Sequence, residues 1–333
     1  MKIDINEILI NKIQENIPPN EKLVTYLMDK LSLGRESAYR RIRNQIPFTI
    51  EEIVMLADEF NFSIDDIIGR NDNQHVFVDV KSDTFQDPQQ AFIELLDMHY
   101  NIMLNVYKAE EKEIVSALNR LAPSYVVGHE YMFKFYYYKW LHQLFKAPSS
   151  LKFSDVTIPP EIILRKNKLR DLLLQTTNTT CTYILDQDLY LNIIKEIQYY
   201  YKRGLISGEE LGLIKKDFHD ILYIVEDMAR NAVNRLNNRY LYYISMLTLE
   251  ASCVYIYHDG EMMQISTPCS LFSMHTTNKD TCIMLKKWLD SMKKYSTLIT
   301  ESNEYIQAAF FKKQHKYLDL DFEEPIFKFI NHF

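Results

Sequence analysis

The chain has 333 residues, of which 47% are apolar and 25% are charged, and a formal net charge of −7 at pH 7. These values indicate a folded chain with room for two or three domains and exclude an intrinsically disordered protein. Because only 7 residues are glycine, Gly-rich phosphate loops, dinucleotide-binding fingerprints and barrels with many tight turns are nearly excluded. A mainly α-helical protein is predicted.

The sequence gives no sign of a membrane or secreted protein. It holds no run of about 20 apolar residues, and charged side chains interrupt residues 1–22, so neither a spanning helix nor a signal peptide is expected. The four cysteines show no CxxC spacing, which is typical of reduced thiols; they are Cys181, Cys253, Cys269 and Cys282. We therefore expect a cytoplasmic protein without membrane association, and no cofactor is predicted.

The first part of the chain is predicted to form five short helices. Apolar spacing and capping residues place them at 4–16, 20–31, 35–44, 50–60 and 63–69. Asn20 is the expected cap of the second helix, and Thr49 with Glu52 forms the capping box of the fourth. Ala38 and Ile42 are the two side chains of the third helix that are expected to face inward.

A polar stretch then separates two predicted domains. Residues 71–84 lack a helical period, and the alternation of valines suggests a short strand at 76–80. We interpret 1–70 as one domain, 71–84 as a linker and 85–333 as a second domain.

The second domain is also predicted to be mainly helical. Asp87 followed by Pro88 starts a helix that is expected to run to about 119, and Ser207 with Glu210 forms another capping box. The other helices are expected at 130–145, 159–175, 188–202, 207–237, 279–293 and 301–316. Two alternating segments flank Asp259-Gly260, so we predict one β-hairpin over 253–266, as a small local sheet at the end of a helical domain.

The helix at 35–44 concentrates positive charge within an acidic domain. Between residues 30 and 43 there are five basic residues and one acidic one, whereas residues 1–75 hold 9 basic and 13 acidic residues. A charged run is usually a solvated helix face, but a helix with a narrow buried side can also enter the DNA major groove, which is ~12 Å wide. The predicted DNA-binding residues are Lys30, Arg35, Glu36, Ser37, Tyr39, Arg40, Arg41 and Arg43.

These residues are expected to differ in role. Arg35, Glu36 and Ser37 lie in the first turn and are placed to reach base edges, with Tyr39 and Arg40 one turn further along. The remaining three, Lys30, Arg41 and Arg43, are interpreted as contacts to phosphate groups, which set position and not sequence.

The segment LMDKLSLGRESAYRRIRNQIPFTIEEIVMLADEFNFSIDDIIG resembles the helix-turn-helix domain of the λ-repressor-like (XRE/Cro-type) family of bacterial transcription regulators. The resemblance covers about residues 4–70. It implies that the helix matching 20–31 crosses the DNA backbone and that the helix matching 35–44 reads bases. Ser32 stands where the family's turn often has glycine, and Gly34 where it usually has a Ser or Thr cap.

Three later segments resemble a bacterial group that joins this kind of helix-turn-helix to a large helical domain of unknown function. They run from Phe133 to Leu141, from Glu196 to Ser207 and from Lys294 to Ile299. The resemblance implies the two-part architecture and supplies no effector.

Catalytic signatures are weak. His129-Glu130 begins like an HExxH zinc motif, but Phe133 replaces the second histidine, so no metal site is predicted. No nucleophile motif is present, and we expect a protein that is not an enzyme.

Repeated tyrosines are the remaining signal. They occur at 131–138, 199–201 and 240–243. A core helix with tyrosines at its rim is the simpler interpretation, and a pocket for a small effector or a protein interface is the alternative.

Together these patterns predict a sequence-specific DNA-binding transcription regulator. Because one short helix offers few contacts, a homodimer on two half-sites of double-stranded DNA is expected, with the second domain dimerising, sensing an effector, or both. The alternative is a protein-interaction module, such as an antitoxin-like or phage-type component, whose second domain holds another protein.

Overall fold

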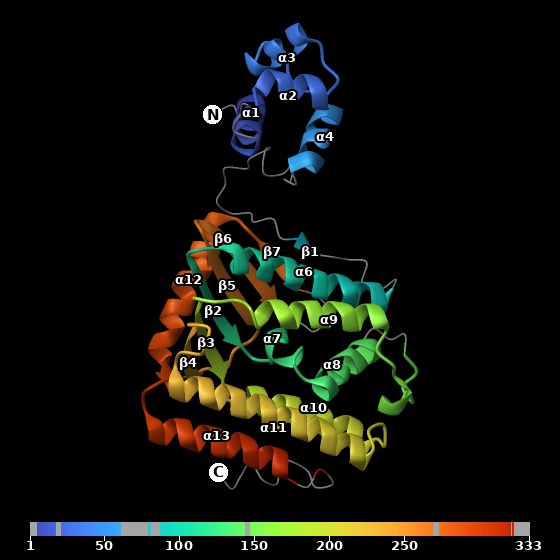
Figure 1. Ribbon diagram of the computed structural model, residues 1–333, viewed down its shortest axis with the longest axis vertical. Coiled ribbons are helices and arrows are strands. Elements are labelled where there is room, and N and C mark those ends of the chain that lie inside the picture. The colour runs from blue at the N-terminus through green and yellow to red at the C-terminus, as the bar shows by residue number, and fades with distance from the viewer. Residues whose placement is uncertain are drawn as a thin grey trace. The chain divides into compact units, whose positions relative to one another are not determined.

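The computed structural model describes residues 5–17, 21–60, 79–80, 87–143, 147–268, 273–320 and 322. The chain divides into unit 1, Met1–Phe77, and unit 2, Val78–Phe333. Both units are drawn in Figure 1, and each is considered by itself.

Unit 1 is built from short helices around a small apolar core. Its described helices are α1 (Ile5–Asn16), α2 (Leu23–Lys30), α3 (Arg35–Ile42) and α4 (Ile50–Phe60). Leu9 and Ile13 of α1, Leu27 of α2 and Leu56 of α4 are buried together with Ala38 of α3. The predicted helices at 4–16, 20–31, 35–44 and 50–60 are thus confirmed as helices, while the predicted helix at 63–69 lies outside the described residues.

Local hydrogen bonds explain how unit 1 begins and joins its helices. Thr49 and Glu52 exchange the two bonds of the predicted capping box, from Glu52 N to Thr49 Oγ1 at 3.2 Å and from Thr49 N to Glu52 Oε2 at 2.9 Å. The N-cap of α2 is Lys22 instead of the predicted Asn20, which lies outside the described residues. Buried Asn6 of α1 donates to Ile46 O and accepts from Phe48 N, both at 3.1 Å, and so holds the α3–α4 connection.

Unit 2 corrects the predicted fold class. It is an α/β domain with a mixed eight-stranded sheet in the order β1-β7-β6-β5-β2-β3-β4-β8, not a helical domain with a small hairpin. The strands are β1 (Asp79–Val80), β2 (Lys112–Leu118), β3 (Thr180–Asp186), β4 (Arg239–Ser245), β5 (Ser252–His258), β6 (Glu261–Thr267), β7 (Met274–Thr276) and β8 (Ser296–Leu298).

Three adjacent strands of the sheet, β2, β3 and β4, are parallel, and helices connect them. Strand β2 pairs with β3, and β3 with β4, in parallel, whereas β5 pairs with β2 antiparallel. The helices of unit 2 are α6 (Pro88–Lys108), α7 (Pro123–Val126), α8 (Glu130–Gln143), α9 (Pro160–Leu173), α10 (Leu189–Lys202), α11 (Gly208–Asn231), α12 (Lys279–Met292) and α13 (Glu304–Asp319).

Helices cover both faces of this sheet unequally. Most of them share one core with Leu118, Tyr183 and Tyr242 on one face, while α12 covers Val115 and Ile184 on the other (Figure 1). A strand that is buried on both faces loses the apolar–polar alternation by which strands are recognised. For this reason the sequence pattern predicts a helix over 87–119 where the structure has β2, and it does not predict β3.

The scarcity of glycine misled the prediction for a physical reason. Parallel strands are joined by helical crossovers, which need few tight turns. The hairpin between β5 and β6 is confirmed, with Asp259 at φ 44° and Gly260 at φ 90° in its turn, but it belongs to the large sheet. The predicted strand in the linker is described at Asp79–Val80, where β1 pairs with β7.

Helix starts were predicted better than helix ends. Asp87 caps α6 through Gln89 N and Gln90 N, and Ser207 with Glu210 forms the capping box of α11. Helix α11 ends at Asn231 instead of 237, because Ala232 adopts φ 54° and the side chain of Asn234 then accepts from two following backbone N–H groups. Among the described helices, none is both long and apolar enough to cross a membrane.

Candidate nucleic-acid interface and internal cavity

The α2–turn–α3 segment presents part of the predicted DNA-binding set to solvent. Helix α3 begins at Arg35 after the N-cap Gly34, and Ala38 is fully buried beneath it. Arg35, Arg40 and Arg43 are exposed, as is Glu36, and none of the three arginines forms an ion pair with a carboxylate in the described part of the chain. These side chains can therefore meet a ligand without breaking an internal pair.

Tyr39 lies between two of the exposed arginines. The guanidinium carbons of Arg35 and Arg43 are 5.8 Å and 5.4 Å from the centre of its ring. Such contacts of a cation with an aromatic ring order long side chains without neutralising their charge. The three residues form one basic and aromatic face of α3.

Arg41, which is predicted to contact phosphate, does not belong to this face. Its side chain is 9% exposed, and its Nε and Nη2 donate to the two carboxylate oxygens of Glu52 at 2.8 and 2.6 Å. Nη1 donates to Ser37 Oγ at 2.8 Å. Arg41 therefore joins α3 to the N-terminus of α4, and Ser37 is occupied by the same contact.

Lys30, another predicted phosphate contact, is also paired within unit 1. Its ammonium contacts the carboxylate of Glu59 on α4, and that hydrogen bond raises the pKa of Lys30. Both partners remain well exposed, so the pair can open to solvent. The sequence could not reveal either pairing, because Glu52 and Glu59 are brought to these cations by the packing of α4.

The turn before α3 contains a strained position. Ser32 has φ 52°, a left-handed conformation that glycine adopts more easily than other residues. Leu33 N donates to Met28 O at 3.1 Å and closes the turn. The backbone at Ser32 thus has a conformation that favours glycine.

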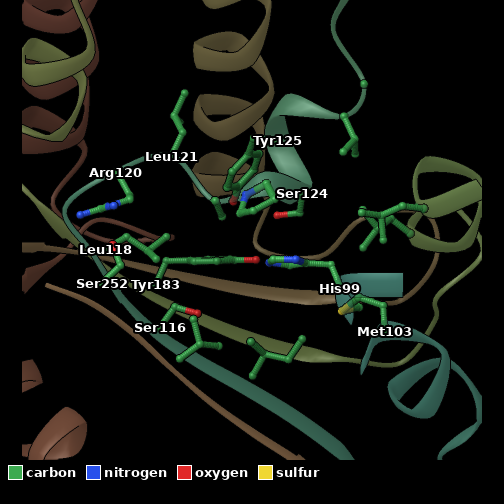
Figure 2. Close-up of a pocket in the computed structure, with 18 of the residues that line it drawn as sticks. His99, Met103, Ser116, Leu118, Arg120, Leu121, Ser124, Tyr125, Tyr183 and Ser252 are labelled. Atoms are coloured by element: carbon green, nitrogen blue, oxygen red, sulfur yellow. The ribbon is translucent and has the colours of Figure 1, made fainter. Parts of the chain in front are cut away.

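Unit 2 contains a cavity of about 610 Å³ that is partly open to solvent. Its floor is one face of β2, β3 and β5, and α6, α8 and α9 contribute walls, with the 119–128 segment after β2 along one side (Figure 2). Most of the lining is apolar or aromatic. Tyr136 and Tyr240, from the predicted tyrosine-rich segments, reach the cavity, as does Trp140, whereas Tyr199 is 55% exposed.

A group of tyrosines stacks along the floor. Tyr183 and Tyr242 have ring centres 5.2 Å apart and planes 15° apart, and the hydroxyls of Tyr125 and Tyr242 are 2.6 Å apart. Burial raises the pKa of all three phenols well above the ordinary value, so they stay protonated and act as neutral hydrogen-bonding groups. Burial also raises the pKa of Cys181 to about 12, which makes its thiol a poor nucleophile.

His99 on α6 also faces the cavity, although no sequence motif singled it out. Its Nδ1 is 2.7 Å from Leu95 O. A carbonyl can only accept, so Nδ1 carries the hydrogen and Nε2 is the acceptor. Burial lowers the pKa of His99, which favours this neutral form.

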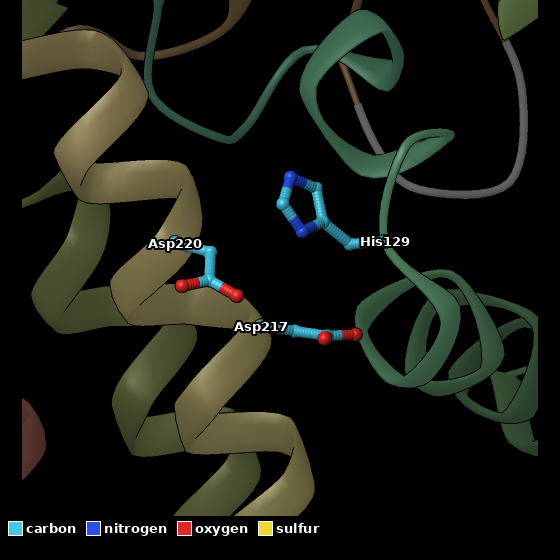
Figure 3. Close-up of side chains that lie close together, drawn as sticks. All are labelled: His129, Asp217 and Asp220. Atoms are coloured by element: carbon cyan, nitrogen blue, oxygen red, sulfur yellow. The ribbon is translucent and has the colours of Figure 1, made fainter. Parts of the chain in front are cut away.

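Unit 2 also brings together His129, Asp217 and Asp220, whose possible ligand atoms lie within 4.8 Å of one another (Figure 3). The buried carboxylate of Asp217 already accepts from Tyr131 N at 2.6 Å and Met132 N at 3.1 Å, and thereby caps α8. Lys216 pairs with Asp220 at 3.3 Å. A divalent cation held by these three residues would compete with both contacts, and the helix cap already explains why Asp217 is buried.

Comparison of the chain with protein-family models, with curated proteins and with solved structures finds no match. The chemistry of the two sites therefore has to be argued from their own residues.

Proposed function

We propose that this chain is a sequence-specific DNA-binding transcription regulator of the λ-repressor-like type, which places α3 in the major groove. The observation that carries the proposal is the exposed set Arg35, Arg40 and Arg43, unpaired among the described residues and presented by one short helix. A guanidinium can donate two hydrogen bonds to guanine or bind phosphate, and both uses need its donors free.

The buried side of α3 supports the same proposal. Ala38 needs little space, and the contacts from Arg41 to Glu52 and Ser37 fix the helix against α4. A recognition helix must be held rigidly, because a shift of its axis would move every side chain relative to the base edges. Arg35 and Glu36 in the first turn are proposed to read bases, and Arg43 at the end of the helix to contact phosphate.

Two copies are part of the proposal. A single short helix in a net acidic chain supplies few contacts, whereas specific sites are typically bound at ~10⁻⁸ M or tighter. Two α3 helices ~34 Å apart would face half-sites one DNA turn apart. The outer side of α12 offers a surface for pairing, since Met284 is 65%, Trp288 41% and Ile283 40% exposed.

Such a regulator would act in the cytoplasm, where the free thiols of Cys181, Cys253 and Cys282 stay reduced.

The test is selection of bound sequences from a random DNA pool by the full-length protein, followed by titration of the selected site. We expect a palindromic site, and Arg35→Ala should relax the preference at one base pair per half-site, at a cost of ~1–3 kcal/mol. Arg43→Ala should weaken binding to all sequences and reduce the salt dependence. Lys312→Ala removes an equal charge at an exposed position of α13 and serves as the control. An unenriched pool, or binding that both α3 substitutions leave unchanged, would contradict the proposal.

The second candidate is a protein-interaction module in which unit 2 holds a different protein. The exposed apolar side of α12 favours it as much as it favours a homodimer. Light scattering on the purified chain separates the two: a dimer that Trp288→Glu dissociates supports the regulator, and a stable monomer supports the alternative.

A further inference from the structure

We propose that the cavity of unit 2 binds a small molecule with an apolar body, a single anionic group at one end and a hydrogen-bond donor at the other. This site is defined by unit 2 alone and does not depend on the DNA-binding proposal.

The size of the cavity indicates a binding site and not a packing defect. Protein interiors are packed as densely as organic crystals, and voids much larger than a water molecule are rare. A volume of about 610 Å³ equals that of some twenty liquid waters at ~30 Å³ each and lies within the ~300–1,000 Å³ range of small-molecule pockets.

The walls define the body of the ligand. Phe92, Ile102 and Met103 of α6, Trp140 of α8 and Leu173 of α9 all line the cavity, and Phe92 packs edge-on against Trp140, with ring centres 5.6 Å apart. These side chains offer few hydrogen bonds to trapped water, so an apolar ligand would be favoured over the solvent it displaces.

One end of the cavity carries an excess positive charge. Arg120, Lys139 and Glu196 all line it, and Lys139 Nζ donates to Glu196 Oε2 at 2.7 Å. Glu196 raises the pKa of Tyr136 and Arg120 lowers it, in addition to the larger effect of burial, so both charges act on one tyrosine. Because Glu196 neutralises the charge of Lys139, Arg120 gives this end of the cavity a net positive charge.

Hydrogen bonds through Asn119 fix the position of the Arg120 side chain. Its Nε donates to Asn119 Oδ1 at 3.3 Å, and Asn119 Nδ2 donates to the carbonyls of Leu249 and Glu250 at 3.1 Å each. Among the described residues no carboxylate forms an ion pair with Arg120. An anchored guanidinium without a counter-ion is suited to bind an anionic group through its remaining donors.

His99 is the reason why the ligand should carry a hydrogen-bond donor at its other end. Figure 2 shows the side chains of His99 and Arg120 on opposite sides of the Tyr183 ring. Because Nδ1 of His99 donates to Leu95 O, its Nε2 can only accept in the neutral form. A ligand hydroxyl or N–H group would satisfy this nitrogen.

The test uses calorimetric titration of the full chain with five eight-carbon probes. These are octanoate, 8-hydroxyoctanoate, octyl phosphate, 1-octanol and octylamine. Both carboxylates and octyl phosphate should bind at least ~10-fold more tightly than octanol, with octylamine weakest, and the ratio of octanoate to octyl phosphate identifies the anionic group. The hydroxylated acid should bind more tightly than octanoate.

Variants then assign the two ends. Arg120→Met should remove the preference of the anionic probes over octanol, and His99→Phe should remove the preference for 8-hydroxyoctanoate over octanoate. Lys312→Met, on exposed α13, removes one charge elsewhere and should change neither. Met103→Trp fills the apolar part and should abolish binding of every probe, which keeps the test valid if Arg120→Met fails to fold. Equal binding of octanol and octanoate by the natural chain, or unchanged probe binding by Met103→Trp, would overturn the proposal.

Discussion

Units 1 and 2 each withdraw a guanidinium from bulk solvent, but they surround it differently. In unit 1 the donors of Arg41 meet both oxygens of Glu52 and the hydroxyl of Ser37. In unit 2 the side chain of Arg120 donates a single hydrogen bond among the described residues, to the amide oxygen of Asn119. A guanidinium whose donors all bind a carboxylate and a neighbouring hydroxyl links two parts of the fold. A guanidinium that donates only one hydrogen bond, to a neutral amide, keeps its charge and its other donors available for another molecule.

The surroundings of the two arginines differ in the same sense. Arg41 lies in a small closed core, where Phe48 is buried beside it, with the guanidinium carbon 5.9 Å from the ring centre. Arg120 lies beside a cavity of about 610 Å³. The comparison therefore makes opposite predictions for replacing each arginine.

The largest expected effect is that of Arg41→Ala. Removing one partner of a buried ion pair leaves Glu52 uncompensated, so the free energy of unfolding of unit 1 should fall by ~3–5 kcal/mol. Hydrogen exchange of the α3 and α4 amides, or urea unfolding of the full chain, measures it. Exposed Arg40→Ala is the matched control and should change stability by less than ~0.5 kcal/mol. Similar losses for both variants would show that the Arg41–Glu52 contact is not structural.

A cluster of histidines in unit 2 provides an intermediate case, in which charges are only partly compensated. His315 of α13 faces His219, Tyr223 and Glu226 of α11, and its Nδ1 is 2.7 Å from Nδ1 of His219. Asp319 of α13 contacts Nε2 of His219 at 3.1 Å. Burial, and then His219, lower the pKa of His315, although Glu226 and Asp319 raise it.

The consequence is a loss of stability in mild acid. Below the ordinary value of 6.5 the unfolded chain binds the proton more readily than folded His315, so the free energy of unfolding should fall as the pH decreases from 6.5. The part of the slope that belongs to His315 is the difference between the natural chain and His315→Gln, and it should stay below the one-proton limit of ~1.4 kcal/mol per pH unit. Other histidines whose pKa is lowered by burial, such as His99, add to the total slope. Urea unfolding between pH 7.5 and 5.5 measures it, and His315→Gln should flatten the dependence. A His315 that titrates at or above 6.5 by NMR would contradict this expectation.

A smaller effect is expected at the turn that positions α3. Ser32 adopts φ 52°, so Ser32→Gly should relieve backbone strain and raise the free energy of unfolding of unit 1 by up to ~1 kcal/mol. Glycine also gains freedom in the unfolded chain, which offsets part of this gain. Ser32→Ala keeps the strain and is the control. If Ser32→Ala is as stable as Ser32→Gly, the left-handed turn contributes no measurable strain.

What the sequence could predict depended on whether the signal was local. The caps at Asp87, Ser207 and Thr49 and the turn at Asp259-Gly260 were predicted correctly, because each rests on hydrogen bonds or dihedral angles within a few residues. The sheet was not predicted, because helices bury both faces of its central strands and remove the alternation of apolar and polar residues.

The two sites follow the same rule. The exposed arginines of α3 were predicted from charge and spacing, but the pairing of Arg41 with Glu52 depends on how α4 packs. His99 comes from α6 and Arg120 from the loop after β2, and only the folded chain brings both to one cavity. Since the strand between them had been predicted as helix, no sequence pattern could bring them into one site.

The smallest effect, and the sharpest contrast with Arg41, is expected for Arg120→Met in the absence of ligand. Methionine keeps the length and apolar part of the side chain and removes a cation that no described carboxylate balances. The free energy of unfolding of unit 2 should therefore change by less than ~0.5 kcal/mol, with stabilisation as the favoured direction. Urea unfolding at pH 7.5 measures it, with Lys312→Met as the exposed control. A loss comparable to that of Arg41→Ala would mean that the Arg120 guanidinium holds the 119–128 segment in place, and the cavity would then lose the free charge on which its anion preference depends.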